Sequence, residues 1–107
     1  ILPCIDHSDT FPNPDQAVLD PDGLLCFGGD LSVTRLVQAY STGIFPWFSE
    51  DEPYLWWSPS ERMVLPPDQL HISKSFKKHI NQNQHQCFIN RNFESVINYC
   101  AKVPRND

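Results

Sequence analysis

Residues 24–43 read LLCFGGDLSVTRLVQAYSTG and contain the strongest local signals in the chain. Residues 24–27 are a short apolar run between turn signals, which predicts a buried strand. After the glycine pair, Asp30 or Ser32 can accept a hydrogen bond from a free N–H of a first helical turn. Apolar residues then recur at i, i+3, i+4 and i+7, namely Val33, Leu36, Val37 and Tyr40. The stretch therefore predicts a strand, a turn and a helix that ends at Gly43.

The residues that follow predict further short elements. Residues 44–48 are apolar but interrupted by proline, and residues 49–53 form an acidic turn. Residues 54–58 and 62–65 are rich in β-forming side chains, so each predicts a strand. The segment between them, Pro-Ser-Glu, is typical of a turn and indicates either a hairpin or a boundary between lobes.

Two more helices and one strand are expected in the last third of the chain. Ser73 can cap a helix whose apolar positions are Ile72, Phe76 and Ile80. Residues 86–90 predict a strand, and Asn92 can cap a last helix. The apolar face of that helix consists of Phe93, Val96, Ile97 and Cys100. From residue 62 onward the expected order is strand, helix, strand, helix, which is an incomplete α/β pattern.

Length and charge exclude several classes of protein. The chain has 107 residues and a formal net charge of −5. This length fits one ordinary domain or two small lobes. No apolar run approaches the about 20 residues that a membrane span requires. A chain this acidic lacks the basic footprint of a protein held to nucleic acid mainly by phosphate contacts, so any such contact must be local.

The cysteines and histidines give no local catalytic or metal signature. Four cysteines stand at positions 4, 26, 87 and 100, without a C-x-x-C pair or zinc-ligand spacing. We expect reduced, mostly buried thiols in a cytoplasmic protein; two disulfides in a secreted domain are the alternative. Residues 28–30, Gly-Gly-Asp, lack the spacing of a phosphate-binding loop and instead favour a tight turn into the helix.

Three tryptophans, at positions 47, 56 and 57, lie close together in the sequence. Packing of these large rings in a core is the simplest interpretation. Trp56 and Trp57 are neighbours in an expected strand, so they face opposite ways and find different environments. Trp47 follows a proline in an expected loop. It is therefore also a candidate platform on which a purine base stacks.

Lys74, Lys77 and Lys78 form the basic cluster of the sequence, with His71 and His79 beside them. Their spacing of i, i+3 and i+4 places the three ammonium groups on one side of the expected helix. The cluster is interpreted either as a solvated helix face or as a patch that contacts phosphates.

Five blocks of residues recur together in one known family. They are residues 21–25 (PDGLL), 28–32 (GGDLS), 43–48 (GIFPWF), 55–59 (LWWSP) and 71–75 (HISKS). In this order they resemble bacterial leucyl/phenylalanyl-tRNA–protein transferases, over a stretch from about Phe11 to Ala101. The resemblance implies transfer of Leu or Phe, less readily Met, from aminoacyl-tRNA to the N-terminal Arg or Lys of an acceptor protein. That transfer marks the acceptor for degradation in the N-degron pathway.

The resemblance also implies an α+β fold. Residues 1–60 are expected to form a small N-terminal lobe, and residues 61–107 the incomplete start of a lobe similar to GNAT acetyltransferases. The family implies a cytoplasmic enzyme that is monomeric when complete, with no metal, organic cofactor or membrane attachment.

The resemblance carries two sites over to this sequence. Trp47 resembles the indole that packs against the 3′-terminal adenosine of aminoacyl-tRNA. Lys74, Lys77 and Lys78 resemble part of the basic surface for the tRNA acceptor end. No catalytic residue is assigned, because the catalytic Asp, Glu and Gln of the family lie beyond residue 107, and the chain alone is expected to be inactive. The alternative function is a non-catalytic module that binds RNA ends or aromatic peptides.

Overall fold

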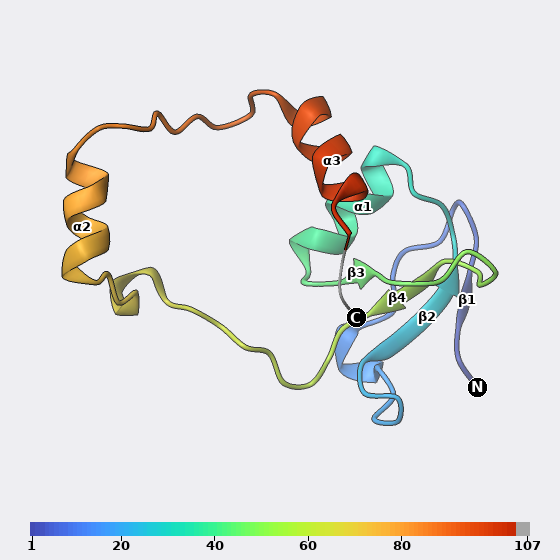
Figure 1. Ribbon diagram of the computed structural model, residues 1–107. Coiled ribbons are helices and arrows are strands. Elements are labelled where there is room, and N and C mark those ends of the chain that lie inside the picture. The colour runs from blue at the N-terminus through green and yellow to red at the C-terminus, as the bar shows by residue number, and fades with distance from the viewer. Residues whose placement is uncertain (105–107) are drawn as a thin grey trace. The chain divides into compact units, whose positions relative to one another are not determined.

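A computed structural model describes residues 1–104. The chain divides between Val64 and Leu65 into two compact units, each described here by itself. Residues 1–64 (unit 1) contain a four-stranded sheet and one α-helix, and unit 2, which begins at Leu65, contains two more α-helices (Figure 1). The expected α+β class is thereby confirmed. Among the described residues, no helix is long and apolar enough to cross a membrane.

The sheet of unit 1 is mixed and has the order β1-β2-β4-β3. Its strands are β1 (Cys4–Ile5), β2 (Leu24–Gly28), β3 (Phe45–Pro46) and β4 (Leu55–Trp57). β1 runs parallel to β2, whereas β4 lies antiparallel to both β2 and β3. The strands expected around residues 24–27 and 54–58 are therefore confirmed. A short 3₁₀ helix, η1 (Pro14–Gln16), lies between β1 and β2.

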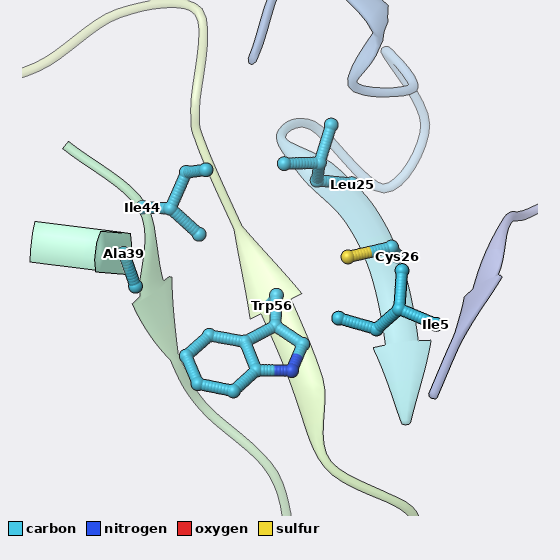
Figure 2. Close-up of a cluster of buried hydrophobic side chains, with 6 residues drawn as sticks. All are labelled: Ile5, Leu25, Cys26, Ala39, Ile44 and Trp56. Atoms are coloured by element: carbon cyan, nitrogen blue, oxygen red, sulfur yellow. The ribbon is translucent and has the colours of Figure 1, made fainter. Parts of the chain in front are cut away.

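The core of unit 1 is built from side chains of the sheet, of α1 and of the segment that joins α1 to β3, as Figure 2 shows. Its buried side chains are Ile5, Leu25, Cys26, Ala39, Ile44 and Trp56. Trp56 is fully buried, and its indole Nε1 donates a hydrogen bond to the carbonyl of Gly28 at 2.9 Å. Phe11 packs edge-to-face on Trp56 with ring centroids 4.8 Å apart. The interpretation of Trp56 as a core residue is thereby confirmed.

The helix α1 (Val33–Ser41) begins and ends as the sequence predicts. Ser32 is the residue that caps it, accepting from the N–H of Arg35. At the other end the Gly43 N–H donates to the Tyr40 carbonyl and the Ile44 N–H to the Ala39 carbonyl. Gly43 has a φ of +76°, the left-handed conformation that this C-terminal motif requires.

The apolar stripe predicted for α1 is mostly exposed. Val33, Val37 and Tyr40 are all more than half exposed, whereas the buried side chains of the helix are Arg35 and Ala39. Ala39 is small enough to let the helix approach the sheet closely, and its side chain joins the core cluster (Figure 2). Of the apolar stripe that the periodicity identified, Leu36 packs against the core and the other three side chains are exposed.

Unit 2 contains a 3₁₀ helix, η2 (Pro67–Gln69), and the helices α2 (Lys74–Asn81) and α3 (Phe93–Lys102). Ser73 caps α2 as expected, accepting from the Phe76 N–H at 3.2 Å. Asn92 stands at the expected start of α3, but its side chain makes no capping hydrogen bond and its φ is +57°. The apolar faces predicted for α2 and α3 are exposed in the described part of the chain.

Two predicted strands are absent from the described structure. Neither residues 62–65 nor residues 86–90 adopt strand structure. The hairpin considered for residues 54–65 is also absent, because β4 pairs with β2 and β3 instead. Both segments have β-forming composition, but a strand also needs a neighbour with which to share hydrogen bonds.

Candidate nucleic-acid interface

Trp47 directly follows β3, and its side chain is 74% exposed. Its main chain is nevertheless fixed on both sides. The Trp47 N–H donates to the Leu55 carbonyl at 3.0 Å. The Trp47 carbonyl accepts from the indole Nε1 of Trp57 at 2.7 Å. The structure therefore presents a flat, exposed ring from a backbone position that is held by hydrogen bonds.

The turn beyond Trp47 is closed by its own contacts. The Ser49 N–H donates to a carboxylate oxygen of Glu52 at 2.7 Å, and the Glu52 N–H donates to the Ser49 carbonyl at 3.1 Å. Phe48 and Tyr54 pack edge-to-face across the turn at 5.1 Å between ring centroids. The acidic turn expected at residues 49–53 is thus a compact tip that joins β3 to β4.

Arg62 supports the other end of β3. Its guanidinium donates to the Gly43 carbonyl and, at 3.4 Å, to the Ser58 hydroxyl. It also lies 5.6 Å from the centre of the Phe45 ring, within reach of a cation–π interaction. Neither Arg62 nor Trp57 was predicted from the sequence to have such a role. For Trp57, strand alternation was the available signal, since it separates this ring from the buried Trp56.

Lys74, Lys77 and Lys78 all lie on α2, and all three side chains are exposed. Within residues 1–104, none of the three ammonium groups lies within 4.0 Å of a carboxylate oxygen. The helix itself contains no Asp or Glu. The structure thus brings the three lysines onto one helix, in unit 2, while Trp47 belongs to unit 1.

Charge is divided unevenly between the two units. Residues 1–64 hold ten of the 13 acidic side chains and two of the eight Lys and Arg. The remaining six basic and three acidic side chains belong to residues 65–107. Although the whole chain has a net charge of −5, unit 2 has more basic than acidic side chains, so it is the part that would attract a polyanion. Counting charges by segment could have found this from the sequence.

The cysteines and histidines of the described residues form no nucleophile–base pair by hydrogen bonding. All four cysteines are free, and three of them are exposed, so the expectation of mostly buried thiols is wrong. Burial raises the pKa of the Cys26 thiol to about 11, which keeps it protonated at neutral pH. Within residues 1–104, no three His, Cys, Asp or Glu side chains are grouped so that they could hold a metal ion.

One histidine is paired with a carboxylate. His7 Nδ1 lies 3.0 Å from a carboxylate oxygen of Asp30, whose other oxygen accepts from the Ser32 N–H at 2.8 Å. The hydrogen bonds from Ser32 and His7 hold the pKa of Asp30 far below its usual range. Asp30 therefore remains ionised and ties the loop before residue 10 to the start of α1.

Comparison with known families covers most of the chain. Residues 29–60 match the family model described as the leucyl/phenylalanyl-tRNA protein transferase N-terminal domain, and residues 64–107 match the model of leucyl/phenylalanyl-tRNA protein transferase. The chain belongs to the leucyl/phenylalanyl-tRNA–protein transferase family. The resemblance inferred from the five sequence blocks is thereby confirmed.

Curated members of this transferase family are similar to nearly the whole chain. The protein named leucyl/phenylalanyl-tRNA–protein transferase from Pseudoalteromonas atlantica is 54% identical over 101 residues, which cover 94% of this chain and 43% of that protein. The protein of the same name from Pectobacterium carotovorum is 55% identical over 85% of this chain and 39% of its own length. The chain thus spans about two fifths of the length of these relatives.

Proposed function

We propose that the full-length protein transfers Leu or Phe, less readily Met, from aminoacyl-tRNA to the N-terminal Arg or Lys of acceptor proteins. It would thereby mark them for N-degron degradation in the cytoplasm. The observation that carries this proposal is the exposed ring of Trp47 on a hydrogen-bonded backbone, within a chain whose relatives are named as transferases of this kind.

In this proposal Trp47 stacks on the terminal adenosine of the tRNA. A base that stacks on an exposed aromatic ring gains about 1–3 kcal/mol, and less of that gain is lost when the main chain that carries the ring is already held in place. Lys74, Lys77 and Lys78 contact phosphates near the acceptor end. Their support is that they are exposed and have no carboxylate partner within residues 1–104.

The division of labour follows from the chemistry of the substrate. An aminoacyl ester is already activated, so the enzyme must position it and remove a proton from the incoming amine. Trp47 and the three lysines belong to the positioning half. The nucleophile is the amine of the acceptor, and no base that would take its proton is assigned among the described residues, so we propose that the 107-residue chain alone is inactive.

We propose that residues 1–60 form an N-terminal lobe and that residues 61–107 begin a GNAT-like acyltransferase lobe. The exposed apolar side chains of α2 and α3 support this assignment, because Phe76, Ile80 and Val96 are each about half exposed in the described part of the chain. Further residues of a larger lobe would cover such faces. The complete enzyme is proposed to act as a monomer.

The test is transfer of labelled Phe from charged tRNA to a substrate with an N-terminal Arg, measured for this chain and for the product of its complete reading frame. We expect transfer by the complete product alone. Transfer by this chain would overturn the inactivity of the 107 residues. Transfer by neither protein, with tRNA binding retained, would favour the alternative of a non-catalytic module that binds RNA ends.

Reversing the charge of the three lysines should change how tRNA binding depends on salt. The triple variant Lys74→Glu, Lys77→Glu, Lys78→Glu should bind tRNA more weakly, and its slope of log K against log salt should fall by about 2 to 3, since each lost phosphate contact removes nearly one unit. Filter binding across a salt series measures both. Lys102→Glu on α3 is the matched control and should leave the slope unchanged. If the triple variant keeps the wild-type slope, the three lysines do not contact phosphates and are a solvated helix face.

A further inference from the structure

Trp56 and Trp57 are adjacent in β4, and the indole N–H of each donates to a main-chain carbonyl ten or more residues away. Trp56 points into the core and bonds Gly28 in the neighbouring strand β2. Trp57 lies half-buried and bonds Trp47, at the end of β3. An indole-to-carbonyl hydrogen bond therefore joins Trp56 to the core strand β2, and a second one joins Trp57 to the residue that carries the exposed ring.

The orientation of Trp47 depends on its main chain. With 74% of its side chain exposed, the ring has few neighbours to hold it. Its N–H is bonded to the Leu55 carbonyl within the β3–β4 pairing, and its carbonyl is bonded only by the Trp57 indole among the hydrogen bonds of the described residues. Because Trp47 lies one residue beyond the end of β3, the sheet fixes its N–H and a side chain fixes its carbonyl.

We infer that Trp57 is a positioning residue that presents the Trp47 ring to its ligand. The inference rests on the proposed function, which supplies the purine nucleoside as the ligand of Trp47. Without the indole donor, the peptide group after Trp47 can rotate and the ring samples orientations that do not stack. Only chains whose Trp47 ring has the stacking orientation can then bind the base. The apparent affinity for the nucleoside falls in proportion to the fraction of chains in that orientation.

Loss of the Trp57 indole donor should weaken nucleoside binding and make the Trp47 ring more mobile. A typical hydrogen bond, once lost, changes an equilibrium constant by about fivefold. Trp57→Phe keeps an aromatic ring in the strand and removes the donor. Trp56→Phe is the matched control, because it removes an identical donor from the adjacent residue and leaves the Trp47 carbonyl bonded.

The 107-residue chain contains three tryptophans, so labelling with 5-fluorotryptophan gives three ¹⁹F resonances, and Trp47→Phe identifies that of Trp47. In Trp57→Phe we expect the Trp47 resonance to shift and to show faster local motion, while the Trp56 resonance keeps its position and reports an intact sheet. Titration with adenosine should require about fivefold more ligand than in the wild type. Trp56→Phe should lower the unfolding temperature and leave the motion and titration of Trp47 unchanged.

An unchanged Trp47 resonance in a folded Trp57→Phe chain would overturn the positioning role. If that variant does not fold, exchange of the indole N–H protons in the wild-type chain tests the positioning role instead. By reciprocity, saturating adenosine should slow exchange of the Trp57 indole N–H and not that of Trp56, and equal exchange with and without adenosine would overturn the inference. Failure of adenosine to perturb Trp47 in the wild type would instead reject the proposed stacking, with the positioning role still judged from ring motion.

Discussion

Replacing Trp47 by alanine in the full-length enzyme should lower kcat/KM for aminoacyl-tRNA by roughly 5- to 150-fold, the equivalent of about 1–3 kcal/mol of stacking. The expected cause is loss of the flat surface on which the terminal adenosine rests. Because the side chain is 74% exposed, its removal exposes no core and should leave the unfolding midpoint close to that of the wild type. Initial rates of Phe transfer over a range of charged tRNA measure the effect.

Trp47→Phe is the control for this prediction, because it keeps a smaller stacking ring and should retain part of the activity. The acceptor protein should be used with unchanged affinity by both variants, since the ring is assigned to the tRNA and not to the acceptor. Equal kcat/KM for aminoacyl-tRNA in the wild type and the alanine variant would remove Trp47 from the binding site. A drop in thermal stability of the alanine variant would assign the ring to the fold instead.

The features that the sequence predicts correctly are local. The limits of α1 depend on Ser32 and Gly43, which act within one turn of the helix ends. The strands β2 and β4 are apolar or aromatic runs bounded by turns. In each case the deciding interactions join residues near one another in the chain, so a pattern of residue types suffices to find them.

The errors concern interactions between distant residues. Residues 62–65 and 86–90 have the composition of strands, but pairing requires a partner that no local pattern supplies. The buried side chains of α1 likewise depend on distant residues. Arg35 is buried because it reaches carbonyl groups more than twenty residues away, and hydrophobic periodicity counts an arginine as an exposed position.

In the candidate site, too, local features could be predicted from the sequence and long-range contacts could not. An exposed Trp47 and a lysine cluster on one helix can be read from residue types and spacing. The supports of Trp47 and of β3 could not be assigned. The bond from Trp57 to Trp47 depends on the register of β3 against β4, and the bond from Arg62 to Gly43 depends on the path of the chain after β4. Such supports appear only once the sheet is assembled.

Replacing Arg35 by methionine should destabilise unit 1 by about 2–6 kcal/mol, because the two partly buried hydrogen bonds that Arg35 donates to main-chain carbonyls are lost and each costs about 1–3 kcal/mol. Arg35 is 4% exposed, and its guanidinium donates to the Asp9 carbonyl at 2.6 Å and to the Asp6 carbonyl at 2.8 Å. It also lies 5.2 Å from the centre of the Phe11 ring. Methionine retains much of the volume and none of the donors, so urea unfolding should report the loss of hydrogen bonds and not of packing.

Arg62→Met is the matched control, since Arg62 also donates to a main-chain carbonyl but does so from an exposed position. Water can replace that bond, and we expect a loss of less than about 1 kcal/mol. Equal losses for the two variants would mean that burial does not set the strength of these bonds. A much larger loss at Arg35 would identify it as the residue that holds the first ten residues, and with them β1, against the sheet. Trp47 pairs with β4 next to the opposite edge of that sheet, so a loss at Arg35 that leaves Trp47 unaffected would separate the stability of unit 1 from the proposed binding site.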